Sequence, residues 1–211
     1  MGATLAEMLV VLLLGTVILT GVLGVYFTSI EHVKNTVALL NLKMELNMAT
    51  NFMATEIRRA GFWHQMASGA ASENPFNTSA MKLNVNSAGD CILFGYDKNG
   101  DGQLSSIGTA GDDEHYGFRL NASSVQARFT DSSYTCTASS GWENLTDTSL
   151  LNVTALSFTL DTQLSTVDSQ TTAELRRVTI SITGSMIGDA TITQTVTKTV
   201  TVRNNYVVVS S

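Results

Sequence analysis

Ala3-Thr4-Leu5-Ala6-Glu7-Met8-Leu9-Val10-Val11-Leu12 opens an apolar run that continues to Ile30, and Glu7 is its only charged residue. The uncharged residues from Met8 to Ile30 would form about 34 Å of helix at about 1.5 Å per residue, which is enough to span a bilayer. A carboxylate at the start of such a helix costs about 2–3 kcal/mol in lipid. The stretch therefore predicts a membrane-spanning helix over residues 3–30 and makes Glu7 a candidate functional residue.

The helical pattern continues beyond the apolar run. No Pro or Gly occurs from Glu31 to Ala60, and Gly61 follows two arginines and an alanine. Basic residues followed by glycine are typical of a helix C-terminus. We expect one continuous helix whose second half, residues 31–60, packs an amphipathic stripe on a globular head. The stripe consists of Val33, Val37, Leu40, Met44, Met48, Phe52 and Ile57.

Residues 61–211 have a different composition, rich in Ser, Thr, Asn, Asp and Gly. Short segments in this region alternate apolar and polar side chains with a period of two, which favours antiparallel strands with one packed face. The predicted strands are Cys91–Tyr96, His115–Leu120, Val125–Phe129, Leu156–Leu160, Val178–Thr183 and Thr191–Arg203. The fold class is therefore α+β, with one long N-terminal helix packed against an antiparallel β-sheet head.

Composition and charge narrow the possible functions. The chain has 211 residues, which suffices for one globular domain and a membrane segment, and its net charge is −6. A net negative charge without basic clusters argues against a nucleic-acid-binding face. The three histidines are scattered, and the sequence contains no nucleophile or phosphate-binding motif. We therefore expect a protein that is not an enzyme.

The N-terminal segment resembles the class III signal of type IV pilins and pseudopilins. In that family a membrane peptidase cuts after a glycine, here Gly2, and the new N-terminus, here Ala3, is N-methylated. The fifth mature residue is a glutamate, here Glu7. Ala3 stands where the family usually has Phe, and only Met1 precedes Gly2. We expect residues 1–2 to be what remains of a longer leader. The alternative to a class III signal is an ordinary signal anchor.

The resemblance implies a role for Glu7 in assembly. The free amine at Ala3 of an incoming subunit would be positive, and Glu7 of a neighbouring subunit would be negative. In a helical bundle of low dielectric, each unpaired charge is expensive and pairing relieves both. The pair would therefore set the register in which subunits are added.

The head resembles the PilW type of minor pilin, and the GspJ pseudopilin of type II secretion is a close alternative. The blocks that carry the resemblance are Ala54–Phe62, Cys91–Gly102, Tyr116–Leu120, Arg177–Gly184 and Val202–Asn204. Export of the head, which this topology implies, would favour a disulfide between the only two cysteines, Cys91 and Cys136. The chain-entropy estimate for a loop of about 46 residues is about 4 kcal/mol. Two buried thiols are the alternative.

One acidic turn has the spacing of a calcium site. Asp97-x-Asn99-x-Asp101-Gly102 resembles the first half of an EF-hand loop, with oxygen ligands at alternate positions. A full loop would have glutamate where Gly108 stands. Further ligands could come from Asp112, Asp113 or Glu114. The alternative is a turn held by hydrogen bonds from side chain to backbone.

Taken with the resemblance, the sequence predicts a structural minor pilin that helps initiate or cap a bacterial type IV pilus. Its expected partners are other major and minor pilins, the prepilin peptidase and the inner membrane before assembly. The head would lie in the periplasm and later in the extracellular filament. The alternatives are a minor pseudopilin of a type II secretion tip complex and a membrane-anchored periplasmic binding or sensing domain.

Overall fold

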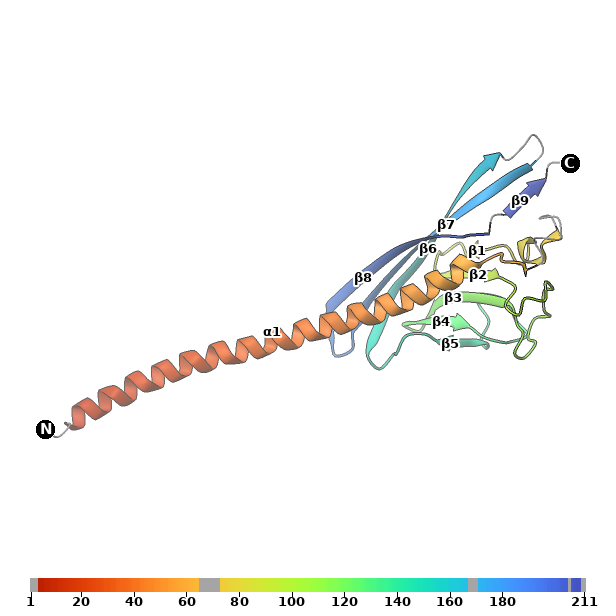
Figure 1. Ribbon diagram of the computed structural model, residues 1–211. Coiled ribbons are helices and arrows are strands. Elements are labelled where there is room, and N and C mark those ends of the chain that lie inside the picture. Colours follow the sequence, from red (N-terminus) through yellow and green to blue (C-terminus); the bar gives the residue numbers. More distant parts are fainter. Residues whose placement is uncertain (1–3, 65–72, 167–170, 205, 210–211) are drawn as a thin grey trace. The chain divides into compact units, whose positions relative to one another are not determined.

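The computed structural model describes residues 4–64, 73–166, 171–204 and 206–209. Helix α1 runs from Leu5 to Arg59, and nine strands follow it in the described part of the chain (Figure 1). The chain divides into two units, residues 1–41 and residues 42–211. The long helix and the antiparallel strands confirm the predicted α+β class.

The first unit consists of the apolar part of α1. Its large apolar side chains from Leu5 to Leu40 are exposed, except for half-buried Ile30. Within the described residues, α1 is the one helix that is long and apolar enough to cross a membrane, judged by length and composition. This agrees with the predicted membrane anchor.

In the second unit, α1 ends where glycine permits a left-handed turn. Gly61 has a φ of 74°, and a Cβ at this position would lie 2.8 Å from Asn77 Oδ1. The backbone N–H of Gly61 donates to the carbonyl of Gly95 (2.8 Å). Strand-side groups also bind the last carbonyls of the helix: Arg203 N–H donates to Arg58 O, and Asn204 Nδ2 donates to the carbonyls of Arg59 and Ala60 (each 3.2 Å). The helix end is therefore capped by the head.

The head contains two antiparallel sheets rather than the single sheet expected. The first sheet has the order β1-β2-β3-β4-β5. Its strands are β1 (Asn84–Val85), β2 (Cys91–Gly95), β3 (His115–Asn121), β4 (Ser124–Arg128) and β5 (Trp142–Asn144). The short η3 helix (Pro75–Asn77) precedes them. Strands β2, β3 and β4 match predicted segments, whereas β1 and β5 are too short to show alternation.

The second sheet is built on two strands of 16 residues each. They are β6 (Leu151–Thr166) and β7 (Thr171–Met186), and β8 (Asp189–Thr201) and β9 (Tyr206–Val209) both pair with β7. The β6–β7 register sets Phe158 opposite Ile180, and a register shift lies between Val153 and Ala155. The long hairpin places a row of buried β-branched residues next to the helix.

The core lies between the second half of α1 and the two sheets. Leu46, Met53 and Ile57 are fully buried and belong to one cluster with apolar side chains of both sheets. From the sheets the cluster takes Ile92, Phe94, Phe118, Leu156, Phe158, Val178, Ile180, Ile182 and Val200. The helix approaches β7 so closely that a Cβ at Gly184 would lie 3.2 Å from Leu46 Cδ2.

The predicted head-facing stripe of the helix is wrong. Six of its seven residues, Val33, Val37, Leu40, Met44, Met48 and Phe52, are 46–61% exposed. Of the predicted stripe, Ile57 alone is buried; the buried face consists of Leu42, Leu46, Ala49, Thr50, Met53, Ala54 and Ile57. Leu46 and Met48 are two residues apart, or about 200° around the helix. Both faces are apolar, so periodicity could not show which one meets the sheets.

Alanine substitutions should separate the two faces of α1. Leu46→Ala leaves a cavity in the core and should lower the free energy of unfolding by about 2–5 kcal/mol. Met48→Ala, on the exposed face, should change it by about 0.5 kcal/mol. Urea unfolding of the full chain in detergent, followed by the fluorescence of Trp63 and Trp142, measures both. Equal losses for the two variants would contradict the observed burial.

Candidate functional site

The structure places one of the three predicted N-terminal site residues. Gly2 and Ala3 lie outside the described residues. Glu7 stands in the first turn of α1, where Thr4 N–H donates to Glu7 Oε2 (2.9 Å) and Glu7 N–H donates to Thr4 Oγ1 (3.4 Å). These reciprocal bonds form a capping box. Glu7 therefore has a partner within its own chain, which we did not predict; the Thr-x-x-Glu spacing is the sequence signal that could have revealed it.

The capping box uses only part of the Glu7 carboxylate. The side chain is exposed, and among the described residues Oε1 makes no hydrogen bond. A second donor can therefore approach Oε1 while Thr4 keeps Oε2. The arrangement orients the carboxylate at the start of α1 and leaves one oxygen for a neighbouring cation.

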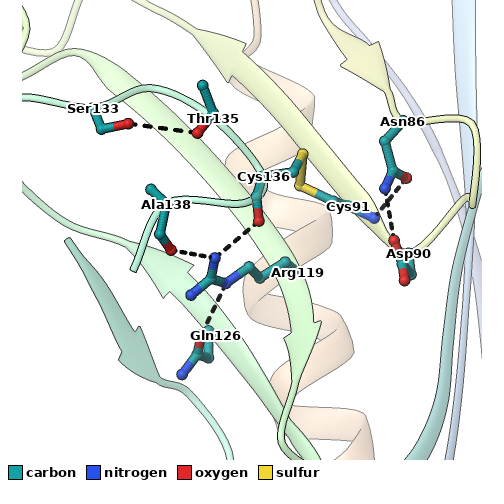
Figure 2. The surroundings of a disulfide bond; sticks show 9 residues. All are labelled: Asn86, Asp90, Cys91, Arg119, Gln126, Ser133, Thr135, Cys136 and Ala138. Atoms are coloured by element: carbon teal, nitrogen blue, oxygen red, sulfur yellow. Dashed lines mark hydrogen bonds between the residues drawn. A yellow bond between two sulfur atoms is a disulfide. The ribbon is translucent and has the colours of Figure 1, made fainter. Parts of the chain in front are cut away.

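The two cysteines form the predicted disulfide. Cys91 on β2 is bonded to Cys136 in the segment after β4, with their Cα atoms 6.0 Å apart. Figure 2 shows Arg119 of β3 beside this bond. Its Nη1 donates to the carbonyls of Cys136 (2.8 Å) and Ala138 (2.7 Å), and its Nε donates to Gln126 Oε1 (2.9 Å). A covalent bond and a charged side chain thus hold the same segment against the first sheet.

A second arginine anchors this segment at its start. Arg128 Nη1 donates to Asp113 Oδ2 (3.0 Å), and its Nη2 donates to the carbonyl of Asp131 (2.9 Å). Asp113 Oδ1 also lies 2.8 Å from His115 Nδ1, and all three charged or titratable side chains are buried. Burial raises the pKa of Asp113, but the N–H of His115 and the Arg128 guanidinium outweigh it and hold this pKa below its usual range. Burial lowers the pKa of His115, which Asp113 only partly opposes.

A cavity of about 340 Å³ opens beside this cluster. Its lining includes Phe52, Glu56 and Arg59 from α1, and Tyr96 and Tyr116 near the first sheet. The two tyrosine rings stack with their centroids 4.1 Å apart, and Tyr96 Oη donates to Glu56 Oε2 (2.5 Å). Burial, followed by hydrogen bonding to Glu56, raises the pKa of Tyr96. These contacts join the helix end to the sheet.

The acidic turn is held by backbone donors. Asp97 is buried, and its carboxylate accepts the N–H groups of His64 (3.0 Å), Gly100 (2.6 Å) and Gly102 (3.1 Å). The Asn99 amide donates to Asp101 Oδ2 (3.0 Å) and to Asp112 Oδ1 (2.7 Å). The structure therefore brings Asn99 and Asp101 together with Asp112.

The other two candidate ligands are directed elsewhere. Asp113 binds Arg128, and buried Glu114 accepts the N–H groups of Lys98 (2.8 Å) and Ser105 (3.1 Å). Burial raises the pKa of Glu114, and the charges of Asp97 and Asp101 raise it further. In the part of the chain that the structure describes, no group of three or more His, Cys, Asp and Glu side chains is placed to hold a metal ion. Calcium binding at Asp97, Asn99 and Asp101 stays a prediction.

Calcium binding has a direct thermal test. Binding to the folded state adds about 2.7 kcal/mol at a hundredfold excess over Kd, so millimolar calcium should raise the Tm of the full chain in detergent relative to chelator. Asp101→Asn with Asp112→Asn should abolish the shift. Asp147→Asn with Asp189→Asn, which changes two acids outside this turn, should retain it. A wild-type Tm that is the same in calcium and in chelator would leave only the turn held by hydrogen bonds.

Comparison with known families draws these features together. The model of the family described as prepilin peptidase-dependent protein B (PpdB) matches residues 35–202. The match begins after the apolar run and includes the second half of α1, both cysteines and strands β1 to β8. No curated protein and no solved structure matches the chain. Because the family model covers well over half of the sequence, the chain belongs to the prepilin peptidase-dependent protein B family.

Proposed function

We propose that this chain is a minor pilin: a structural subunit that helps initiate or cap a type IV pilus. Family membership supports processing by the prepilin peptidase, and the apolar part of α1 supports anchoring in the inner membrane before assembly. The head would lie in the periplasm and move into the extracellular filament. Other major and minor pilins would be its partners.

The observation that carries the proposal is the second apolar face of α1. Met44 and Met48 are exposed although the opposite face of the same helix is buried in the head. Burying each such side chain is worth about 1.5–3 kcal/mol. Met44 lies 14 residues, or about 21 Å of helix, beyond Ile30, where the uncharged run ends. A bilayer that covers the run to Ile30 does not reach Met48, so a protein surface is the natural cover.

The exposed apolar face of α1 favours a minor pilin over an anchored domain that never assembles. A membrane-anchored binding or sensing domain that never assembles would gain nothing from an apolar surface beyond the bilayer. A minor pseudopilin of a type II secretion tip complex would need the same helix face and the same peptidase. The neighbouring genes distinguish the pilus from the secretion system.

Processing is the first expected property. Mature protein in the native host should begin at N-methylated Ala3, because Gly2 occupies the position after which the peptidase cuts. Gly2→Val should leave the chain uncut in the inner membrane. Mass spectrometry of the N-terminus reads both results. Intact Met1-Gly2 on chain recovered with filaments would refute cleavage at this site.

The Glu7 charge and the Glu7 cap can be tested separately. Glu7→Gln keeps a side chain that can complete the capping box but removes the charge for a neighbouring Ala3 amine. It should lower incorporation into sheared filaments by about tenfold if the pair is worth about 1.4 kcal/mol. Thr4→Val removes the capping hydroxyl and keeps the charge, so it should incorporate almost normally. Immunoblots of membrane and filament fractions measure the ratio.

The two variants also show whether the Glu7 charge or the helix cap is responsible for incorporation into filaments. Normal incorporation of Glu7→Gln would exclude the charge pair. A loss with Thr4→Val as large as that with Glu7→Gln would assign the effect to the helix cap instead.

A further inference from the structure

Strand β8 is an outer strand of the second sheet, and its long edge is open (Figure 1). The other edges are short or partly covered. Strands β1 and β5 have two and three residues. On β6, the N–H groups of Val153 and Phe158 donate to the carbonyls of Ser123 (2.8 Å) and Gly89 (2.7 Å). β8 has 13 residues and, among the strands that the structure describes, pairs with β7 alone. Long open edges are sites at which another strand can add.

The register shows which backbone groups of β8 face outward. Val202 N–H donates to Arg176 O (2.9 Å), which continues the register that sets Thr201 opposite Arg177. In an antiparallel ladder, alternate residues bond to the same neighbour. Even-numbered residues such as Val196 therefore bond to β7. The N–H and C=O groups that point to the open side belong to Thr193, Thr195, Thr197 and Thr199.

The pairing of β6 with β7 shows independently that the even-numbered residues of β8 bond to β7. Phe158 N–H points away from β7, so the odd-numbered residues of β6 bond to β7. These residues stand opposite odd-numbered residues of β7, such as Ser157 opposite Ser181. The even-numbered residues of β7 are left to bond with β8. Among the described residues, none pairs with the outward groups of Thr195, Thr197 and Thr199.

The side chains of β8 protect this edge at one position only. The hydroxyls of Thr195, Thr197 and Thr199 lie within hydrogen-bond distance of β7 hydroxyls on the exposed face (2.8, 3.3 and 3.1 Å). Lys198 is the only charged residue from Ala190 to Val202, and its Nζ contacts Asn51 Oδ1 of α1. Charged side chains and prolines are the usual protection of an edge strand. Lys198 is the one such residue from Ala190 to Val202, and its side chain is directed to the helix.

The charge pattern disfavours a second copy at this edge. Two β8 strands paired about Thr197 would place their Lys198 side chains diagonally on one face, about 7–8 Å apart. Pairing about Thr195, which gives the longest overlap, would instead set Lys198 opposite the apolar Ile192. Neither strand has a carboxylate from Ala190 to Val202 to compensate Lys198. An acidic residue on the helix-facing side of a different strand would instead complement Lys198, whose partner Asn51 is neutral.

We infer that the β8 edge docks an extended segment of a different filament subunit by strand addition, with an acidic side chain of that segment next to Lys198. This inference rests on the proposed function as an assembled subunit. The docked strand would take up the outward N–H and C=O groups of Thr195, Thr197 and Thr199. It would extend the second sheet from one subunit into the next.

Proline substitution tests the open edge. Thr197→Pro removes an outward N–H, and proline is tolerated on edge strands, so the full chain should keep its Tm within a few degrees and be processed normally. Incorporation into filaments should fall by about tenfold. Thr197→Ala is the matched control and should incorporate normally. Val196→Pro removes an N–H that bonds to β7 and should destabilise the head. Normal incorporation of a folded Thr197→Pro chain would overturn the inference.

Hydrogen exchange gives a second readout that needs no substitution. The amides of Thr195, Thr197 and Thr199 should exchange rapidly in the purified full chain in detergent, and roughly a hundredfold more slowly in filaments. The amides of Val196 and Val200 should be protected in both states. Equal exchange of the threonine amides in both states would overturn strand addition. Protection in the purified chain, together with a dimeric mass, would identify a second copy and overturn the assignment to a different subunit.

Failure of the proposed function would look different from failure of the inference. If wild-type chain is absent from filaments, the proposed pilin role fails. The exchange comparison is then made on chain in host membranes. Slow exchange of the three threonine amides there would still support docking at β8, and rapid exchange would overturn it.

Discussion

Helix α1 carries apolar side chains on two opposite faces, and the head covers only one of them. The face with Leu46, Met53 and Ile57 forms the centre of the core, and strands of both sheets contact it. Gly184 of β7 permits a close approach of the helix, because a Cβ there would lie 3.2 Å from Leu46 Cδ2. The opposite face, with Met44 and Met48, is left exposed. The head therefore buries one side of the helix and leaves the apolar side chains on the other side in contact with solvent.

Polar interactions and a disulfide, and not apolar packing, hold one segment against the first sheet. The segment from Phe129 to Gly141 contains few large apolar residues. The disulfide holds it covalently instead, and Arg119 and Arg128 donate hydrogen bonds to its backbone carbonyls. Because the Arg128 guanidinium is buried and Asp113 neutralises it, neither charge is left uncompensated in a region of low dielectric. An ordered loop is thereby obtained from a sequence that supplies little hydrophobic area.

The parts of the fold that were predictable from sequence have long, regular patterns. The helix was predictable because none of its 55 residues is a strong helix breaker, and β8 was predicted almost in full from its alternating threonines. Of the two longest strands, β6 and β7, only the central segments Leu156–Leu160 and Val178–Thr183 were predicted. The orientation of the helix was not, because Met48 and Leu46 are equally apolar. The pairing into two sheets was not, because alternation does not reveal which strands are neighbours. The cap formed by Thr4 and Glu7 was readable, but the stronger signal of a charge in an apolar run obscured it.

The capped end of α1 has a mechanical consequence. The carbonyls of Arg58, Arg59 and Ala60 all accept donors from the segment that follows β8, and Gly61 is bonded to β2. A pull along the helix axis is therefore shared among several hydrogen bonds in parallel, together with the buried contacts of Leu46 and Ile57. Bonds that share tension break together rather than in sequence. We therefore expect a rapid pull on the helix to need more force to break this joint than it would if the same hydrogen bonds broke one after another.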